Sequence, residues 1–152
     1  MSEIIDSPEN NVTNAAAAVA IKDGKVLLVR EGEGSSHITG KYGIPSGRLE
    51  AGESDLDAAV REFGEESGLT ASREDFSEFP GNFYQASIPR KGGEVVKFNW
   101  RVFRVAKFSG EIRGSGDVTP EWVDISNLQQ MQEEEKLLPN VFNAVQAAMM
   151  AS

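Results

Sequence analysis

The chain has 152 residues, of which 39% are hydrophobic and 26% charged, as in an ordinary globular domain. It has no cysteine, which excludes disulfides and thiolate ligands, and its formal charge of −9 disfavours nonspecific binding to nucleic acid or to an anionic membrane. No apolar run approaches the ~18 residues of a membrane span, and no signal-peptide pattern is present, so we expect a cytoplasmic protein without a membrane segment.

The N-terminal third predicts a flexible tail followed by a β-hairpin. Residues 1–13 are polar and are expected to form the tail, with a single domain over residues 14–152. Apolar runs at 15–21 and 25–30 flank a Lys-Asp-Gly turn signal, which favours two paired strands. A loop rich in Gly and Ser over residues 31–41 leads to a short extended piece at 42–45.

The next element is a helix that begins at Ser54 and ends just before Gly68. Ser54 is a good N-cap residue, and Gly68 suits the position just past a helix C-terminus. Apolar residues at i, i+3, i+4 and i+7 spacing define its core face, namely Leu56, Ala59, Val60 and Phe63.

The second half predicts two long extended segments, a loop, a strand and a final helix. The extended segments cover 76–88 and 95–107, the loop covers 109–120, and the strand covers 121–124. The last helix has Pro139 near its first turn and an apolar stripe made of Leu138, Val141, Phe142, Val145 and Met149. Strands on both sides of a central helix predict an α/β fold, a sandwich around a mixed sheet.

Three acids of the central helix, Glu62, Glu65 and Glu66, are expected to converge. At roughly 100° per residue they lie within one turn of each other and away from the apolar face of the helix. Carboxylate oxygens are hard ligands of the kind that Mg²⁺ and Mn²⁺ prefer. The alternative interpretation is a solvated charged surface, the usual role of acidic runs.

These acids belong to a longer pattern. Its fixed residues are Gly47, Glu53, Arg61-Glu62, Glu65-Glu66 and Gly68, with apolar Phe63 and Leu69 between and after them. This spacing resembles the complete Nudix box at each fixed position. A weaker resemblance covers roughly residues 14–150, with Tyr42, Ser46 and Phe63 departing from the usual residues. It implies a Nudix-type α/β/α sandwich.

The resemblance implies a metal-dependent pyrophosphohydrolase with Mg²⁺ or Mn²⁺ as cofactor. Water would attack phosphorus in a nucleoside diphosphate linked to another moiety, and the metal charge would offset the negative charge of both protein and substrate. Carried over residue by residue, the metal ligands are Glu62, Glu66, Glu65 and the Gly47 carbonyl.

The resemblance also assigns catalytic residues beyond the ligands. Glu53 and Arg61 are expected to form an ion pair that orients the ligands. Glu65 is either a ligand or the general base, and Asp117 and Glu121 are the other candidates for the base.

Candidates for substrate binding are Arg30, Arg48, Tyr84 and Arg101, which offer cations for phosphate or a ring for stacking. The substrate is expected to be a nucleotide-type small molecule, with nucleoside triphosphates, dinucleoside polyphosphates and ADP-ribose all left open. The alternative function is a catalytically silent Nudix fold that senses nucleotides. Family resemblance also leaves a homodimer open.

Overall fold

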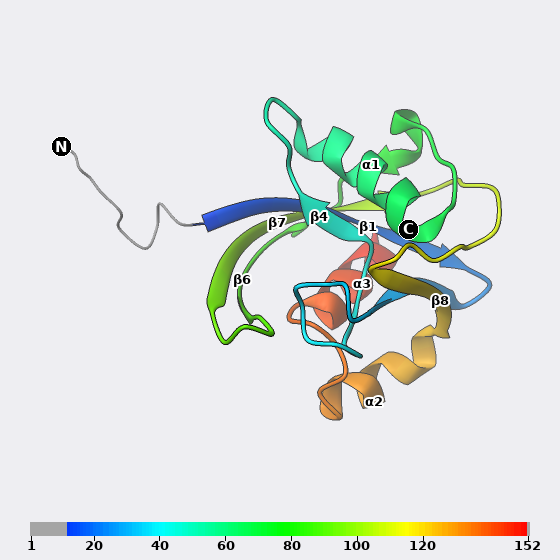
Figure 1. The fold of residues 1–152 in the computed structure, drawn as a ribbon. Coiled ribbons are helices and arrows are strands. Elements are labelled where there is room, and N and C mark those ends of the chain that lie inside the picture. The colour runs from blue at the N-terminus through cyan, green and yellow to red at the C-terminus, as the bar shows by residue number, and fades with distance from the viewer. Residues whose placement is uncertain (1–11, 152) are drawn as a thin grey trace.

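A mixed β-sheet lies between helix α1 (Asp55–Ser67) on one face and helices α2 (Leu128–Glu133) and α3 (Val141–Met150) on the other in the computed structural model, which describes residues 12–151 (Figure 1). The expected α/β/α sandwich is therefore confirmed. Residues 1–11 of the expected tail lie outside the described residues. Val12 and Thr13, which were assigned to the tail, belong to a strand and pair with Lys97 and Phe98.

Strand β1 (Val12–Lys22) is the centre of the sheet. It runs parallel to β7 (Val95–Val105) and antiparallel to β2 (Lys25–Glu31) and β4 (Ser46–Arg48). Residues 15–20 of β1 are buried because helices cover both faces of the sheet. Burial on both faces overrides the helix propensity of this alanine-rich run. The predicted hairpin is confirmed, with Asp23 and Gly24 at positive φ in its turn.

The other strands join β2 and β7. Antiparallel pairing adds β3 (Tyr42–Gly43) and β8 (Val118–Asp124) to β2, and β5 (Phe76–Ser77) and β6 (Phe83–Pro89) to β7. The helices outside α1 are η2 (Arg73–Asp75), η3 (Ile125–Asn127), α2 (Leu128–Glu133) and α3 (Val141–Met150). Among residues 12–151, no helix has the length and apolar character that crossing a bilayer requires.

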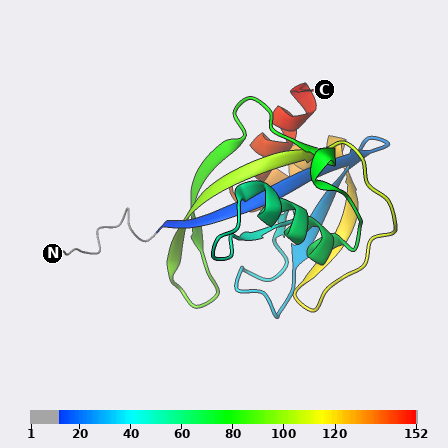
Figure 2. The same ribbon diagram turned by 90° about the horizontal axis from the view of Figure 1, so that it is seen from above.

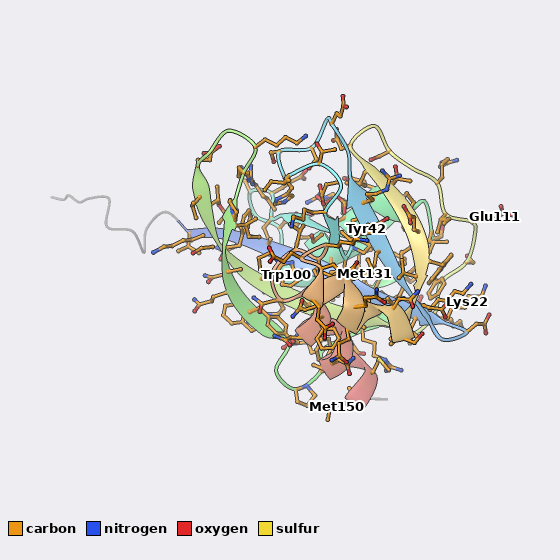
Figure 3. All side chains as sticks on the ribbon, turned by 90° about the horizontal axis from the view of Figure 1, so that it is seen from below. Lys22, Tyr42, Trp100, Glu111, Met131 and Met150 are labelled. Atoms are coloured by element: carbon orange, nitrogen blue, oxygen red, sulfur yellow. The ribbon has the colours of Figure 1, made fainter. Side chains whose placement is uncertain are left out.

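Two cores fill the space on either side of the sheet, because alternate residues of β1 face opposite layers. Helix α1 (Asp55–Ser67) lies across β1 (Figure 2) and packs Phe63 against Ala16 and Ala18. Helices α2 and α3 cover the other face, where Ala17 and Val19 lie in the second core. Figure 3 views this face and labels Tyr42, Trp100 and Met131, which pack against that second core.

The ends of α1 match their prediction. The Ser54 side chain accepts a hydrogen bond from the Asp57 amide at 3.1 Å, and Gly68 adopts φ 80°. A left-handed residue at this position favours glycine, which ends the helix directly after the acidic turn.

Several expected boundaries were wrong. The segment 76–88 is not continuous, because a turn around Gly81 separates β5 from β6. Strand β8 begins at Val118 rather than 121, since Val118 and Pro120 are buried against β2. Helix α2 and strand β4 were not predicted, and α3 begins at Val141, with Met149 exposed.

Phe63 is expected to be the most sensitive core position of α1. Its side chain is 1% exposed and makes edge contacts with Phe76 and Phe108. Phe63→Ala is expected to lower the free energy of unfolding by about 3–5 kcal/mol, because it leaves a large cavity under the helix. Urea denaturation would measure this loss. Phe83→Ala, at a ring that is 45% exposed, is the matched control and should cost about 1 kcal/mol or less.

Candidate active site

A cleft of about 780 Å³ opens beside α1 and contains most of the predicted site. Glu62, Glu65 and Glu66 line one wall, together with Gly47 and Arg48 of β4. Strand β4 brings them together because it pairs with residues 15–17 of β1, next to helix α1. The rest of the cleft is lined by residues from distant parts of the chain, including Glu31, His37, Phe98, Asp117 and Leu138.

Arg61 is the hub of the acidic wall. Its Nε and Nη2 donate to the two oxygens of Glu53 at 2.9 Å each, so the predicted ion pair is bidentate. Its Nη1 donates to Glu62 at 2.7 Å and to Glu65 at 3.4 Å, and its Nη2 also donates to the Arg48 carbonyl at 3.0 Å. One guanidinium therefore holds helix α1 against β4.

Within this network the pKa values of Glu53 and Glu62 are shifted in opposite directions. Hydrogen bonds from Arg61 lower the pKa of Glu53 to about 2, with a further contribution from the Glu50 amide. Burial raises the pKa of Glu62, although the hydrogen bond from Arg61 opposes this. Glu53 is therefore a fixed anion, whereas Glu62 lacks solvation for its charge.

Glu66 is the most deeply placed carboxylate of the wall. Burial raises its pKa to about 8, although its Oε1 accepts a hydrogen bond from the Ser46 amide at 2.9 Å. Neighbouring Glu62 raises this pKa further. Two poorly solvated carboxylates side by side favour a cation, because it would restore the charge balance that burial removes.

The side chains of Glu62, Glu65 and Glu66 do not surround a single point. Within residues 12–151, no three histidine or acidic side chains are arranged as a metal centre. The expected convergence of three carboxylates is thus only partial, since Glu62 and Glu65 turn to Arg61 and Glu66 turns to β4. The donor set still fits Mg²⁺ or Mn²⁺, because every predicted ligand is a hard oxygen and two of the carboxylates lack solvation.

The backbone of Gly47 lies directly against Glu62. A Cβ at position 47 would overlap the Glu62 carboxylate and would lie 2.7 Å from its Oε1. This close approach explains why the pattern requires glycine here, and it places the Gly47 main chain beside a predicted ligand.

The four predicted substrate-binding residues are not brought together. Arg48 lines the cleft, whereas Arg30, Tyr84 and Arg101 lie outside it. Arg30 pairs with Glu121 at 3.0 Å, and Arg101 pairs with Asp55 at 3.2 Å. Tyr84 packs beside Trp100 with ring centroids 5.9 Å apart.

The three candidates for the general base are also separated. Glu65 and Asp117 line the cleft, and the Glu65 side chain is 60% exposed. Glu121 lies outside the cleft and accepts hydrogen bonds from Arg30 and Tyr42. Glu65 and Asp117 are therefore placed to meet a ligand in the cleft.

Sequence reasoning missed two residues that line the cleft, Glu31 and Phe98. A buried-side acid two residues after an apolar run, as Glu31 is after the run Val26 to Val29, was an available signal. Phe98 carried no comparable signal, since it is one of several aromatic residues on β6 and β7.

The fold is an α/β sandwich, and its cleft has a wall of helix carboxylates that is held by the Arg61–Glu53 ion pair and packs against the Gly47 backbone. The NUDIX domain model matches residues 12–143. The chain therefore belongs to the NUDIX domain family.

Individual relatives agree with this assignment. The chain is 32% identical over 110 residues to an oxidized purine nucleoside triphosphate hydrolase of Danio rerio, covering 72% of this chain and 65% of the relative. It is 27% identical over 126 residues to an ADP-ribose pyrophosphatase of Methanocaldococcus jannaschii, covering 82% of this chain and 69% of the relative. The crystal structure of a MutT protein from Methanosarcina mazei superposes with a TM-score of 0.72 at 22% identity, covering 91% and 94% of the two chains. That likeness establishes the fold.

Proposed function

We propose that the protein is a Mg²⁺- or Mn²⁺-dependent pyrophosphohydrolase that cleaves a nucleoside diphosphate linked to another moiety. One observation carries the proposal. Two poorly solvated carboxylates, Glu62 and Glu66, lie beside the Gly47 backbone in the wall of a cleft of about 780 Å³. A cleft of this volume fits a nucleotide-sized ligand.

The residues of the acidic wall have distinct roles in this proposal. Glu62, Glu65, Glu66 and the Gly47 carbonyl would hold the cation. When bound, the cation neutralises the diphosphate and makes a water molecule more acidic. The bidentate Arg61–Glu53 pair orients α1, and Arg61 also holds the Glu62 carboxylate through a hydrogen bond of 2.7 Å.

The reaction is an in-line displacement at phosphorus. The oxygen of water forms a bond to phosphorus, the bond from phosphorus to the bridging oxygen breaks, and the leaving phosphate departs with the bridging oxygen. A carboxylate accepts the proton of the attacking water, and Glu65 and Asp117 are the candidates that line the cleft. The products are two phosphate species.

The substrate class includes nucleoside triphosphates, dinucleoside polyphosphates and ADP-ribose. The names of the zebrafish and archaeal relatives support a nucleotide substrate. The cysteine-free sequence supports a reducing, cytoplasmic location.

Arg48 is expected to contact the substrate phosphates. It lines the cleft next to the Gly47 backbone, and its carbonyl is held by Arg61. Arg48→Ala is expected to raise KM about tenfold, because one charge-assisted contact to phosphate is lost. Steady-state kinetics would measure this, with Arg101→Ala as the comparison outside the cleft. Equal KM values for Arg48→Ala and the wild type would contradict the assignment.

A hydrolysis panel tests the proposal. It would contain nucleoside triphosphates, dinucleoside polyphosphates, ADP-ribose and sugar nucleotides, each with Mg²⁺ or Mn²⁺ and with chelator, and chromatography would separate the products. Metal-dependent turnover of at least one compound is the expected result. If no compound is turned over but nucleotides bind tightly, the protein is a nucleotide sensor rather than an enzyme.

A further inference from the structure

His37 and Arg90 line the cleft, and the proposed chemistry uses neither of them. His37 lies in the loop after β2 and Arg90 directly follows strand β6, and an isolated antiparallel bridge joins the two residues. Lys91 reinforces this contact, because its amide donates to the Ser36 carbonyl at 3.3 Å and its Nζ donates to the Gly32 carbonyl at 3.0 Å. Contacts to the backbone therefore hold the two side chains in the same part of the cleft.

Phe98 supports both side chains. It lies on β7, and only 8% of its surface is exposed. The rings of His37 and Phe98 have centroids 6.3 Å apart. The guanidinium carbon of Arg90 lies 5.6 Å from the centroid of the Phe98 ring, which is a cation–π contact. The two nitrogen-bearing side chains therefore share one fixed apolar surface of the cleft.

The hydrogen-bonding groups of this pair are not satisfied within the protein. Among residues 12–151, His37 Nδ1 and Arg90 Nε are the two buried side-chain atoms without a hydrogen-bond partner. A buried polar atom without a partner is costly, because it loses its hydrogen bond to water and gains none. A ligand with acceptor oxygens in this part of the cleft would allow both side chains to rotate toward it, which would remove the cost.

The charged groups that act on His37 are cations. Burial lowers the pKa of His37, and the charges of Arg90 and Arg48 lower it further. Arg48 lines the same cleft, and neither arginine forms an ion pair within residues 12–151. The sequence has 24 acidic and 15 basic residues, so a shortage of acids does not explain this. The arginines that do pair with acids are Arg30, Arg61, Arg73 and Arg101. Two unpaired guanidinium groups in one cleft favour an oxyanion.

We propose that His37, Arg48 and Arg90 form an anion site that binds a phosphate group of the substrate outside the diphosphate held at the cation. Arg48 connects the two sites, because it directly follows Gly47, whose backbone lies against Glu62. Guanidinium groups match the geometry of phosphate oxygens, and a neutral histidine adds one N–H donor without a further positive charge. This inference rests on the proposed function, since it names a further contact of that substrate.

Pyrophosphate or phosphate released by the reaction is a second source of the same chemistry. The two sources are distinguishable by kinetics. A contact to the substrate depends on how many phosphates the substrate carries, whereas a site for the free product leaves the KM of every substrate unchanged.

Arg90→Gln tests the site without hydrolysis. The probe is inorganic pyrophosphate, and calorimetry in the presence of chelator measures its binding without a contribution from a cation. Arg90→Gln is expected to weaken this binding at least about tenfold, because one charge-assisted contact is lost. His37→Phe should weaken it as well, since it keeps a ring against Phe98 and removes both nitrogens. Arg113→Gln is the matched control, because it removes the same charge at an exposed residue that does not line the cleft.

The kinetic test compares the best nucleoside triphosphate of the panel with the diphosphate of the same nucleoside. Arg90→Gln should raise KM for the triphosphate at least about tenfold. The affinity for the diphosphate, measured as KM or as an inhibition constant, should equal that of the wild type.

Equal pyrophosphate binding by Arg90→Gln and the wild type would overturn the inference, even if the hydrolysis panel succeeded. Weaker pyrophosphate binding with an unchanged KM for the triphosphate would also overturn it, in favour of a site for the free product. Pyrophosphate binding that is lost in Arg90→Gln and kept in Arg113→Gln would support the anion site even if no compound were hydrolysed.

Discussion

Glu66→Gln is expected to reduce kcat/KM by about 10²–10³-fold at saturating Mg²⁺. The carboxylate combines the deepest burial of the acidic wall with a fixed orientation from the Ser46 amide at 2.9 Å. Glutamine keeps the shape and can still accept that hydrogen bond, but it removes the charge that a divalent cation needs. Steady-state kinetics of the best panel substrate would measure the loss, and Glu74→Gln, at an exposed acid of η2, is the control.

The same variant has a stability signature that separates metal binding from misfolding. Burial raises the pKa of Glu66 from the ordinary 4.5 to about 8, so without metal the folded wild type holds a proton that the unfolded chain has lost. The contribution of this group to stability therefore falls as pH rises from about 4.5 to about 8. Without metal, the Glu66→Gln protein is expected to melt at a higher temperature than the wild type at pH 8. Added Mn²⁺ should raise the melting temperature of the wild type and leave the variant unchanged. A similar Mn²⁺ response in both proteins would contradict the ligand assignment.

The local part of the site could be predicted from sequence because it lies on one helix and one short strand. Helical periodicity places Glu62, Glu65 and Glu66 on one side of α1, and the caps at Ser54 and Gly68 set its length. The Arg61–Glu53 pair followed from the family pattern, and the structure shows it as a bidentate contact.

The part of the cleft outside α1 and β4 could not be predicted because it depends on contacts between distant segments. Strand alternation does not reveal which cations are already paired, and Arg30 and Arg101 are both held by acids outside the cleft. The environment of Glu31 depends on Gly43 and Leu138, which come from other parts of the chain. The orientation of the acidic side chains could not be predicted either, because one Arg61 guanidinium binds both Glu62 and Glu65.

Gly47→Ala is expected to lower kcat/KM about 100-fold without unfolding the protein. The new methyl group would overlap the Glu62 carboxylate, which would have to rotate away from its 2.7 Å contact with Arg61. Displacing a predicted ligand and its orienting contact disturbs the metal and the water at once, and small misplacements of this kind cost about 10²-fold. Kinetics combined with a Mn²⁺ titration would show a lower turnover and a weaker affinity for the metal.

The control for Gly47→Ala is Gly92→Ala in the turn between β6 and β7, where a Cβ would meet nothing within 4 Å. Both substitutions add one methyl group and reduce the freedom of the unfolded chain in the same way, so a difference between them reports the contact with Glu62. Full activity of Gly47→Ala would mean that Glu62 can leave its place without consequence. Glu62 would then be a residue of the cleft wall, and the cation would have to be held by Glu65 and Glu66 instead.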